Sequence, residues 1–122
     1  MSQLLNNLKS ITKNISSTMY DLIKNDPSKR IVIGDLINQI SLHQNTRHSQ
    51  VYLLGLVFQT FSLSVDSFDF KLETKGINNE QLLEFIVRKD GITLFSYKGF
   101  EYHKNSLVDE IKIPESIYHT LV

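Results

Sequence analysis

The chain contains no cysteine among its 122 residues, which excludes disulfides, thiolate metal sites and cysteine nucleophiles. It also lacks a long hydrophobic run, since the longest, residues 51–58, is well below the ~18 apolar residues expected of a membrane span. No basic stretch followed by an apolar core and a small-residue cleavage site opens the sequence, so no secretory signal is expected. These absences predict a cytoplasmic protein without membrane contact.

Neither a repeat nor a low-complexity linker divides the chain, so we expect a single domain over residues 1–122. Thirteen basic and thirteen acidic residues cancel. Residues 1–65 hold six basic and three acidic side chains (+3), which leaves −3 for residues 66–122. This mild asymmetry is far from the basic balance of a protein that binds nucleic acid chiefly through phosphates.

Helical periodicity dominates the first half of the sequence. Apolar residues recur every three or four positions over residues 2–25, which predicts an amphipathic helix that ends before Pro27. A short β-branched run, residues 31–33, leads into a second predicted helix over residues 34–42. Residues 50–65, QVYLLGLVFQTFSLSV, have no obvious polar face, so they are interpreted as a buried third helix around which the domain is organised.

Strand periodicity follows. Apolar and charged residues alternate over residues 68–73, and residues 81–89 and 92–97 flank the turn Asp90-Gly91, which is typical of a hairpin. A helix over residues 80–88 is the alternative for the first of these two runs. Residues 100–103 would extend the hairpin to a meander, and residues 105–111 and 114–120 would form helical pieces. The predicted fold class is thus α+β: three N-terminal helices, a small antiparallel β-meander and a short C-terminal helix.

The residues that could perform chemistry are dispersed. Two histidines, His43 and His48, are five residues apart, a spacing that fits neither a helical zinc site nor a zinc finger. His103 and His119 have no nearby ligand pattern, and no Gly-x-Ser-x-Gly turn or phosphate loop is present. We therefore predict no metal, no catalytic residues, no cofactor and no small-molecule substrate, and hence no enzyme.

Aromatic residues crowd one short stretch of the second half. Phe95 and Tyr97 share one strand parity, and Phe100 and Tyr102 share the other, so a small sheet cannot bury all four unless both of its faces are covered. One pair is expected either to be covered by the terminal helices or to contact a partner. The favoured function is a small non-enzymatic protein-binding or regulatory module, with a second copy of the chain as a candidate partner, giving a homodimer.

DNA binding is the alternative function. The order of the predicted elements is like that of a winged helix in outline, with the third helix as recognition helix and the hairpin at Asp90-Gly91 as wing. Thr46, Arg47, His48 and Gln50 would then begin the recognition helix, and Arg88 and Lys89 would contact the nucleic acid. The composition of residues 51–58 opposes this interpretation, because a recognition helix needs a solvent-facing side along most of its length.

Overall fold

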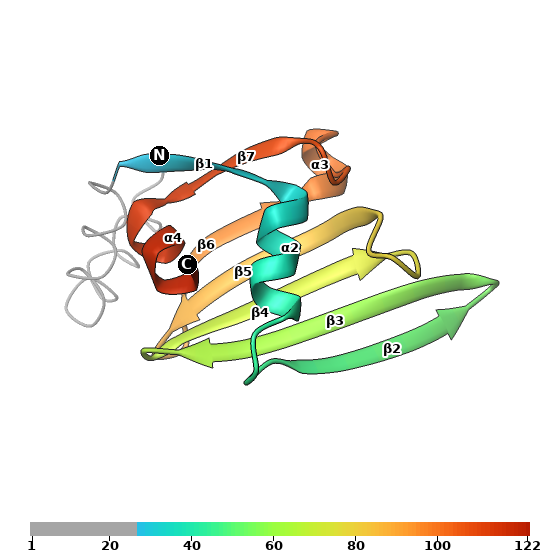
Figure 1. The fold of residues 1–122 in the computed structure, drawn as a ribbon, viewed down its shortest axis with the longest axis horizontal. Helices are drawn as coiled ribbons and strands as arrows, with labels where there is room; N and C mark the ends of the chain where they lie inside the picture. The colour runs from blue at the N-terminus through green and yellow to red at the C-terminus, as the bar shows by residue number, and fades with distance from the viewer. Residues whose placement is uncertain (1–26) are drawn as a thin grey trace, which may run out of the picture.

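The computed structural model describes residues 27–122 and shows a mainly β protein (Figure 1). Five strands form an antiparallel meander in the order β2-β3-β4-β5-β6, and two further strands, β1 and β7, pair antiparallel in a separate sheet. The strands are β1 (Ser28–Val32), β2 (Arg47–Leu53), β3 (Leu56–Val65), β4 (Phe68–Lys75), β5 (Gln81–Lys89), β6 (Ile92–Lys98) and β7 (Glu110–Pro114). The helices are α2 (Ile33–Ser41), α3 (Gly99–Tyr102) and α4 (Glu115–Leu121).

Three of the strand connections are two-residue turns. The pairs Leu53–Leu56, Val65–Phe68 and Lys89–Ile92 close the β2–β3, β3–β4 and β5–β6 hairpins. Both central residues of each turn have positive φ, as type I′ turns require: Leu54 (52°) and Gly55 (78°), Asp66 (51°) and Ser67 (69°), Asp90 (52°) and Gly91 (79°). These turns match the twist of the strands, so each strand follows its neighbour directly.

The core lies between the five-stranded sheet and the elements that cover one of its faces. Helix α2 lies across this face (Figure 1) and buries one apolar stripe, Ile33, Leu36, Ile37 and Ile40. Alternate residues of β3 and β4 are buried beneath it, together with Leu82, Phe85 and Val87 of β5, which is the pattern of a sheet with one covered face. Strand β7 and helix α4 complete the core with Ile111, Ile113, Ile117 and Leu121.

The start of α2 is joined to the loop between α3 and β7. The first backbone N–H groups of a helix have no partner within the helix. Here the N–H of Ile33 donates to the carbonyl of Asp109 at 2.8 Å, and the N–H of Gly34 donates to the carbonyl of Leu107 at 2.9 Å. The loop therefore provides the N-terminal hydrogen bonds that no side chain of α2 supplies.

The predicted third helix is wrong. Residues 50–65 form the second half of β2, the Leu54-Gly55 turn and β3. The stretch is rich in β-branched and aromatic residues, which favour strands, and Gly55 provides positive φ at the turn rather than a site of close packing. Because this helix is absent, the predicted winged-helix order is wrong as well. The described residues form a meander sheet, not three N-terminal helices followed by a wing.

Some of the other local predictions are confirmed and some are wrong. The second helix, the strand over residues 68–73, the Asp90-Gly91 hairpin and the last helix are confirmed within a few residues, and residues 81–89 are strand rather than helix. Residues 100–103 are not a third strand, because α3 turns the chain there. The helix expected at residues 105–111 is wrong as well, since a loop leads directly into β7. The first predicted helix, residues 2–25, lies outside the described residues.

Candidate functional site

The most unusual surface of residues 27–122 is an apolar hairpin arm. Strand β4 pairs with β3 only as far as Phe58, so residues 52–57 extend beyond the rest of the sheet (Figure 1); together with Val51, the partner of Phe58, they are here called the hairpin arm. Five large apolar side chains of the arm are exposed: Val51, Tyr52, Leu53, Leu54 and Leu56. Leu54 is 93% exposed, and Tyr52 is 68% exposed. An apolar cluster of this kind is a common feature of protein contacts.

The base of the arm is held by a buried amide, Gln59, whose residue is only 3% exposed. Its Nε2 donates to the carbonyls of Gly76 at 2.7 Å and Ile77 at 3.2 Å, which places its Oε1 toward β2. This oxygen accepts hydrogen bonds from His48 Nε2 at 2.7 Å and Gln50 Nε2 at 3.3 Å. One side chain thus joins β2, β3 and the β4–β5 connection at the point where the arm begins.

The free edge of β2 is a second feature of the arm. Every residue of β2 is exposed, and its only described strand neighbour is β3. An edge strand presents unpaired N–H and C=O groups, and natural proteins usually protect such edges with charges, proline or bulges. Strand β2 has no proline, its pairing with β3 is unbroken, and its one charged residue, Arg47, lies at its start. Among residues 27–122, no further strand pairs with this edge.

The residues predicted to contact nucleic acid are not brought together. Thr46 donates its hydroxyl hydrogen bond to the carbonyl of Ile40 near the end of α2. Arg47, His48 and Gln50 lie on β2, whereas Arg88 and Lys89 lie on β5, with two strands between. The ring of His48 stacks on Phe61 at 4.5 Å between centroids, Arg88 Nε donates to Thr93 at 3.3 Å, and Lys89 Nζ lies 4.6 Å from the ring centroid of Phe68. No recognition helix carries them.

The four predicted aromatic residues separate into an inner and an outer pair. Phe95 packs against the core residue Phe85 with 5.9 Å between centroids, and Tyr97 packs against the same core. Phe100 and Tyr102 are exposed on α3. Tyr102 nevertheless stacks on Tyr97 at 5.0 Å, a contact that strand parity did not predict because α3 turns the chain. Their role in protein binding stays a prediction.

Two ionisable groups among residues 27–122 have shifted pKa values: Asp109, in the loop between α3 and β7, and Tyr97, on β6. Hydrogen bonds from the backbone N–H of Ser106 (3.0 Å) and from its hydroxyl (3.1 Å) lower the pKa of Asp109 below its ordinary value, and the charge of Lys104 adds to this. Partial burial raises the pKa of Tyr97, and so do the nearby Asp109 and Tyr102. Asp109 therefore stays ionised and Tyr97 neutral near pH 7.

Among residues 27–122, no group of three or more His, Asp or Glu side chains is placed to hold a metal ion. In the same residues, no helix is long and apolar enough to cross a membrane. No protein-family model, curated protein or solved structure matches the chain.

The sequence interpretation missed the hairpin arm because it assigned these apolar residues to a buried helix. One signal was available. The runs VYL and LVF are β-formers on either side of Leu54-Gly55, and glycine there is compatible with a two-residue turn.

Proposed function

We propose that this protein is a non-enzymatic protein-binding module that self-associates through its hairpin arm. The main support for self-association is the conformation and exposure of the turn residue Leu54. This leucine is 93% exposed and has a φ of 52°. A left-handed backbone costs an ordinary L-residue about 1–2 kcal/mol, and an exposed leucine recovers none of that cost by packing in the monomer.

Asparagine or aspartate would suit the same position better, because both tolerate positive φ and both prefer water. The equivalent position in the β5–β6 turn is indeed aspartate, Asp90, with the same φ of 52°. A residue that disfavours the isolated domain in two ways is expected where function, rather than folding, determines the choice. Contact with a partner would bury Leu54 and its apolar neighbours.

Two features support a second copy as that partner. Residues 48–65 contain no Asp, Glu, Lys or Arg, so two arms can meet without repulsion between like charges. A two-fold axis brings the same surface of both copies together, and an edge strand pairs naturally with itself in the antiparallel direction. The free edge of β2 would supply the backbone hydrogen bonds, and the apolar residues of the arm would supply buried area.

Burial of the arm would contribute favourably to association. Complete burial of a Val or Leu side chain contributes about 1.5–3 kcal/mol. The arm exposes four such side chains together with Tyr52. Even incomplete burial of these groups on both copies would offset several kcal/mol of the cost of bringing two molecules together.

Sedimentation equilibrium of the full chain over a range of concentrations tests the proposal. We expect a monomer–dimer equilibrium that Leu53→Lys shifts to monomer, since a lysine at this position would have to be buried between two arms. Val108→Lys is the matched control: Val108 is 83% exposed and lies in the loop before β7, far along the chain from the arm. The control should dimerise like the unmodified chain.

Two results would contradict the proposal. The unmodified chain could sediment as a monomer at every concentration, or Leu53→Lys and Val108→Lys could weaken association equally. The second result would place the contact outside the arm.

A further inference from the structure

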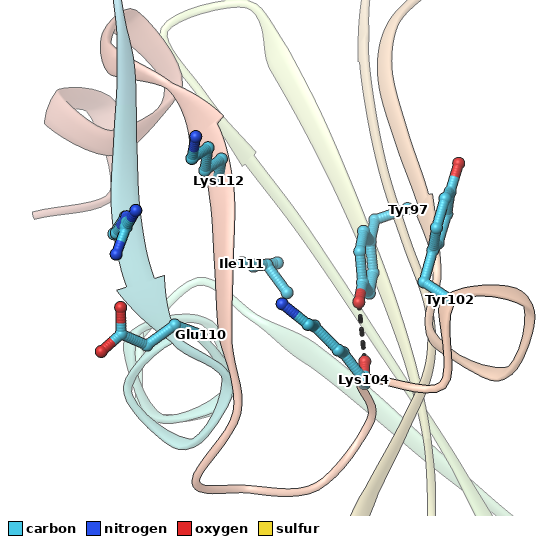
Figure 2. Close-up of a pocket in the computed structure, with 7 residues that line it drawn as sticks. Tyr97, Tyr102, Lys104, Glu110, Ile111 and Lys112 are labelled. Atoms are coloured by element: carbon cyan, nitrogen blue, oxygen red, sulfur yellow. Dashed lines mark hydrogen bonds between the residues drawn. The ribbon is translucent and has the colours of Figure 1, made fainter.

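A groove of about 370 Å³ separates the β1–β7 sheet from β6 and the segment that follows it. In Figure 2, Tyr97, Tyr102 and Lys104 lie on one side of the groove, and Glu110, Ile111 and Lys112 of β7 lie on the other. Arg30 of β1 completes the lining. The groove is at the β6 side of the meander, whereas the hairpin arm is at the β2 side, so the two surfaces are separate.

The charges of the groove are unbalanced. Arg30 and Lys112 are direct partners in the β1–β7 register, and like charges opposite each other destabilise a strand pair. Lys104 contributes a third cation from the other side, while Glu110 is the one carboxylate of the lining. Three cations and one anion give the lining residues a formal charge of +2, and the ionised Asp109, whose charge acts on Lys104 and Tyr97, reduces the positive charge around the groove. Within residues 27–122, Arg30, Lys104 and Lys112 form no ion pair.

The tyrosines make one wall of the groove rigid. Their rings stack with 5.0 Å between centroids and 19° between planes. The hydroxyl of Tyr97 donates to the carbonyl of Lys104 at 2.7 Å, the dashed line in Figure 2, and so fixes the backbone from which the Lys104 side chain extends. Tyr97 adds no negative charge to the groove near pH 7, because its ordinary pKa of 10.0 is already well above that pH and is raised further here.

We infer that this groove binds a small organic phosphate. The guanidinium of Arg30 offers a planar pair of donors that fits a phosphoryl group, and the ammonium groups of Lys112 and Lys104 supply further positive charge. The tyrosine rings provide an apolar surface for a planar organic group attached to that phosphate. The volume is near the lower end for ligand sites, which run from about 300 to 1,000 Å³, so it suits a single small molecule.

Glu110 makes the inference more specific. A carboxylate beside the cations weakens the attraction for any anion, so it opposes use of the groove as a general polyanion surface. It can instead accept a hydrogen bond from a hydroxyl group of the ligand. Removal of its charge should therefore strengthen the binding of a phosphate that carries no hydroxyl group.

Calorimetric titration of the full chain at constant ionic strength tests this inference with phenyl phosphate as probe. Methyl phosphate has the same phosphoryl group without the ring, and phenol has the ring without the phosphoryl group. We expect phenyl phosphate to bind more tightly than either. Arg30→Gln and Lys112→Gln should each weaken its binding by about tenfold or more, since each removes a charge-assisted contact. Glu110→Gln should strengthen it severalfold.

Arg47→Gln is the matched control, because Arg47 is an exposed strand arginine at the opposite edge of the meander. Its binding of phenyl phosphate should be unchanged, and thermal unfolding should confirm that every variant is folded. The inference fails if phenyl phosphate shows no saturable binding, if methyl phosphate binds equally well, or if Arg47→Gln weakens binding as much as Arg30→Gln. None of these outcomes depends on the oligomeric state, so failure here leaves the proposed self-association to its own test.

Discussion

Replacing Leu54 by asparagine should make the isolated protein more stable and its association weaker. Leu54 occupies the first central position of the β2–β3 turn with a φ of 52°. Asparagine adopts this backbone readily, and Asn-Gly is a preferred sequence for a type I′ turn. The leucine side chain is 93% exposed, so its removal leaves no cavity in the monomer. The two effects of Leu54→Asn are therefore opposite in sign and separately measurable.

The gain in stability follows from the backbone. If asparagine relieves most of the cost of a left-handed leucine, the free energy of unfolding should rise by about 1 kcal/mol. For a chain of this size, that gain corresponds to a thermal unfolding midpoint about 4 °C higher. Urea unfolding should be measured at the lowest usable concentration, because dimerisation itself adds apparent stability. Asp90→Asn is the control, since Asp90 has the same φ and already tolerates it.

The loss of association follows from burial. Each copy would lose the contribution of one leucine side chain, about 1.5–3 kcal/mol when fully buried. Sedimentation equilibrium should therefore show a dissociation constant raised at least about tenfold, since every 1.4 kcal/mol is a factor of ten. A Leu54→Asn variant less stable than the unmodified chain would show that the left-handed backbone of the turn does not disfavour leucine. A variant that associates as strongly as before would show that Leu54 is not buried between two arms.

Three further outcomes are expected. In urea unfolding, Gln59→Leu should lower the free energy of unfolding by about 2–3 kcal/mol, because it removes two hydrogen bonds of 2.7 Å from a buried site. The control Ser62→Ala, on the exposed face of β3, should change the free energy of unfolding by less than about 0.5 kcal/mol. The carboxylate of Asp109 binds its proton less readily in the folded protein than in the unfolded chain. Its stabilising effect is therefore complete above the ordinary pKa of 3.8 and is lost as the pH falls through the lower pKa of the folded state. Asp109→Asn should flatten that part of a plot of stability against pH. Gly99→Ala should cost about 1–3 kcal/mol in the same unfolding assay, since a Cβ there would overlap the carbonyl oxygen of Leu82.

Part of the fold was predictable because some signals are local. The alternation of Phe68, Phe70 and Leu72 with charged residues specifies a half-covered strand without reference to the rest of the chain. Asp90-Gly91 specifies its hairpin in the same way, because few residue pairs accept positive φ at both positions. The apolar stripe of α2 has the helical period, and its buried residues are those the stripe predicts.

The candidate sites were harder to predict from the sequence than the fold. Tyr97 and Tyr102 were both among the four aromatic residues singled out in the sequence, but in different pairs. Their stacking depends on α3, where Gly99 approaches the backbone of β5. Arg30 and Lys112 are 82 positions apart, and only the β1–β7 register makes them neighbours. The groove is thus formed by pairing between distant segments, for which a single sequence contains no periodic signal.

The hairpin arm shows where local information ends. The sequence by itself determined that residues 50–65 are apolar, β-branched and interrupted by one glycine. Such a run fits a buried helix or a pair of strands, because hydrophobicity alone does not distinguish them. Tertiary structure decided the outcome: β3 has β2 and β4 as neighbours, the pairing of β3 with β4 stops at Phe58, and the residues beyond this point are exposed. Phe61 and Leu63 of this run belong to the core, whereas Val51 to Leu56 form the surface on which the proposed function rests.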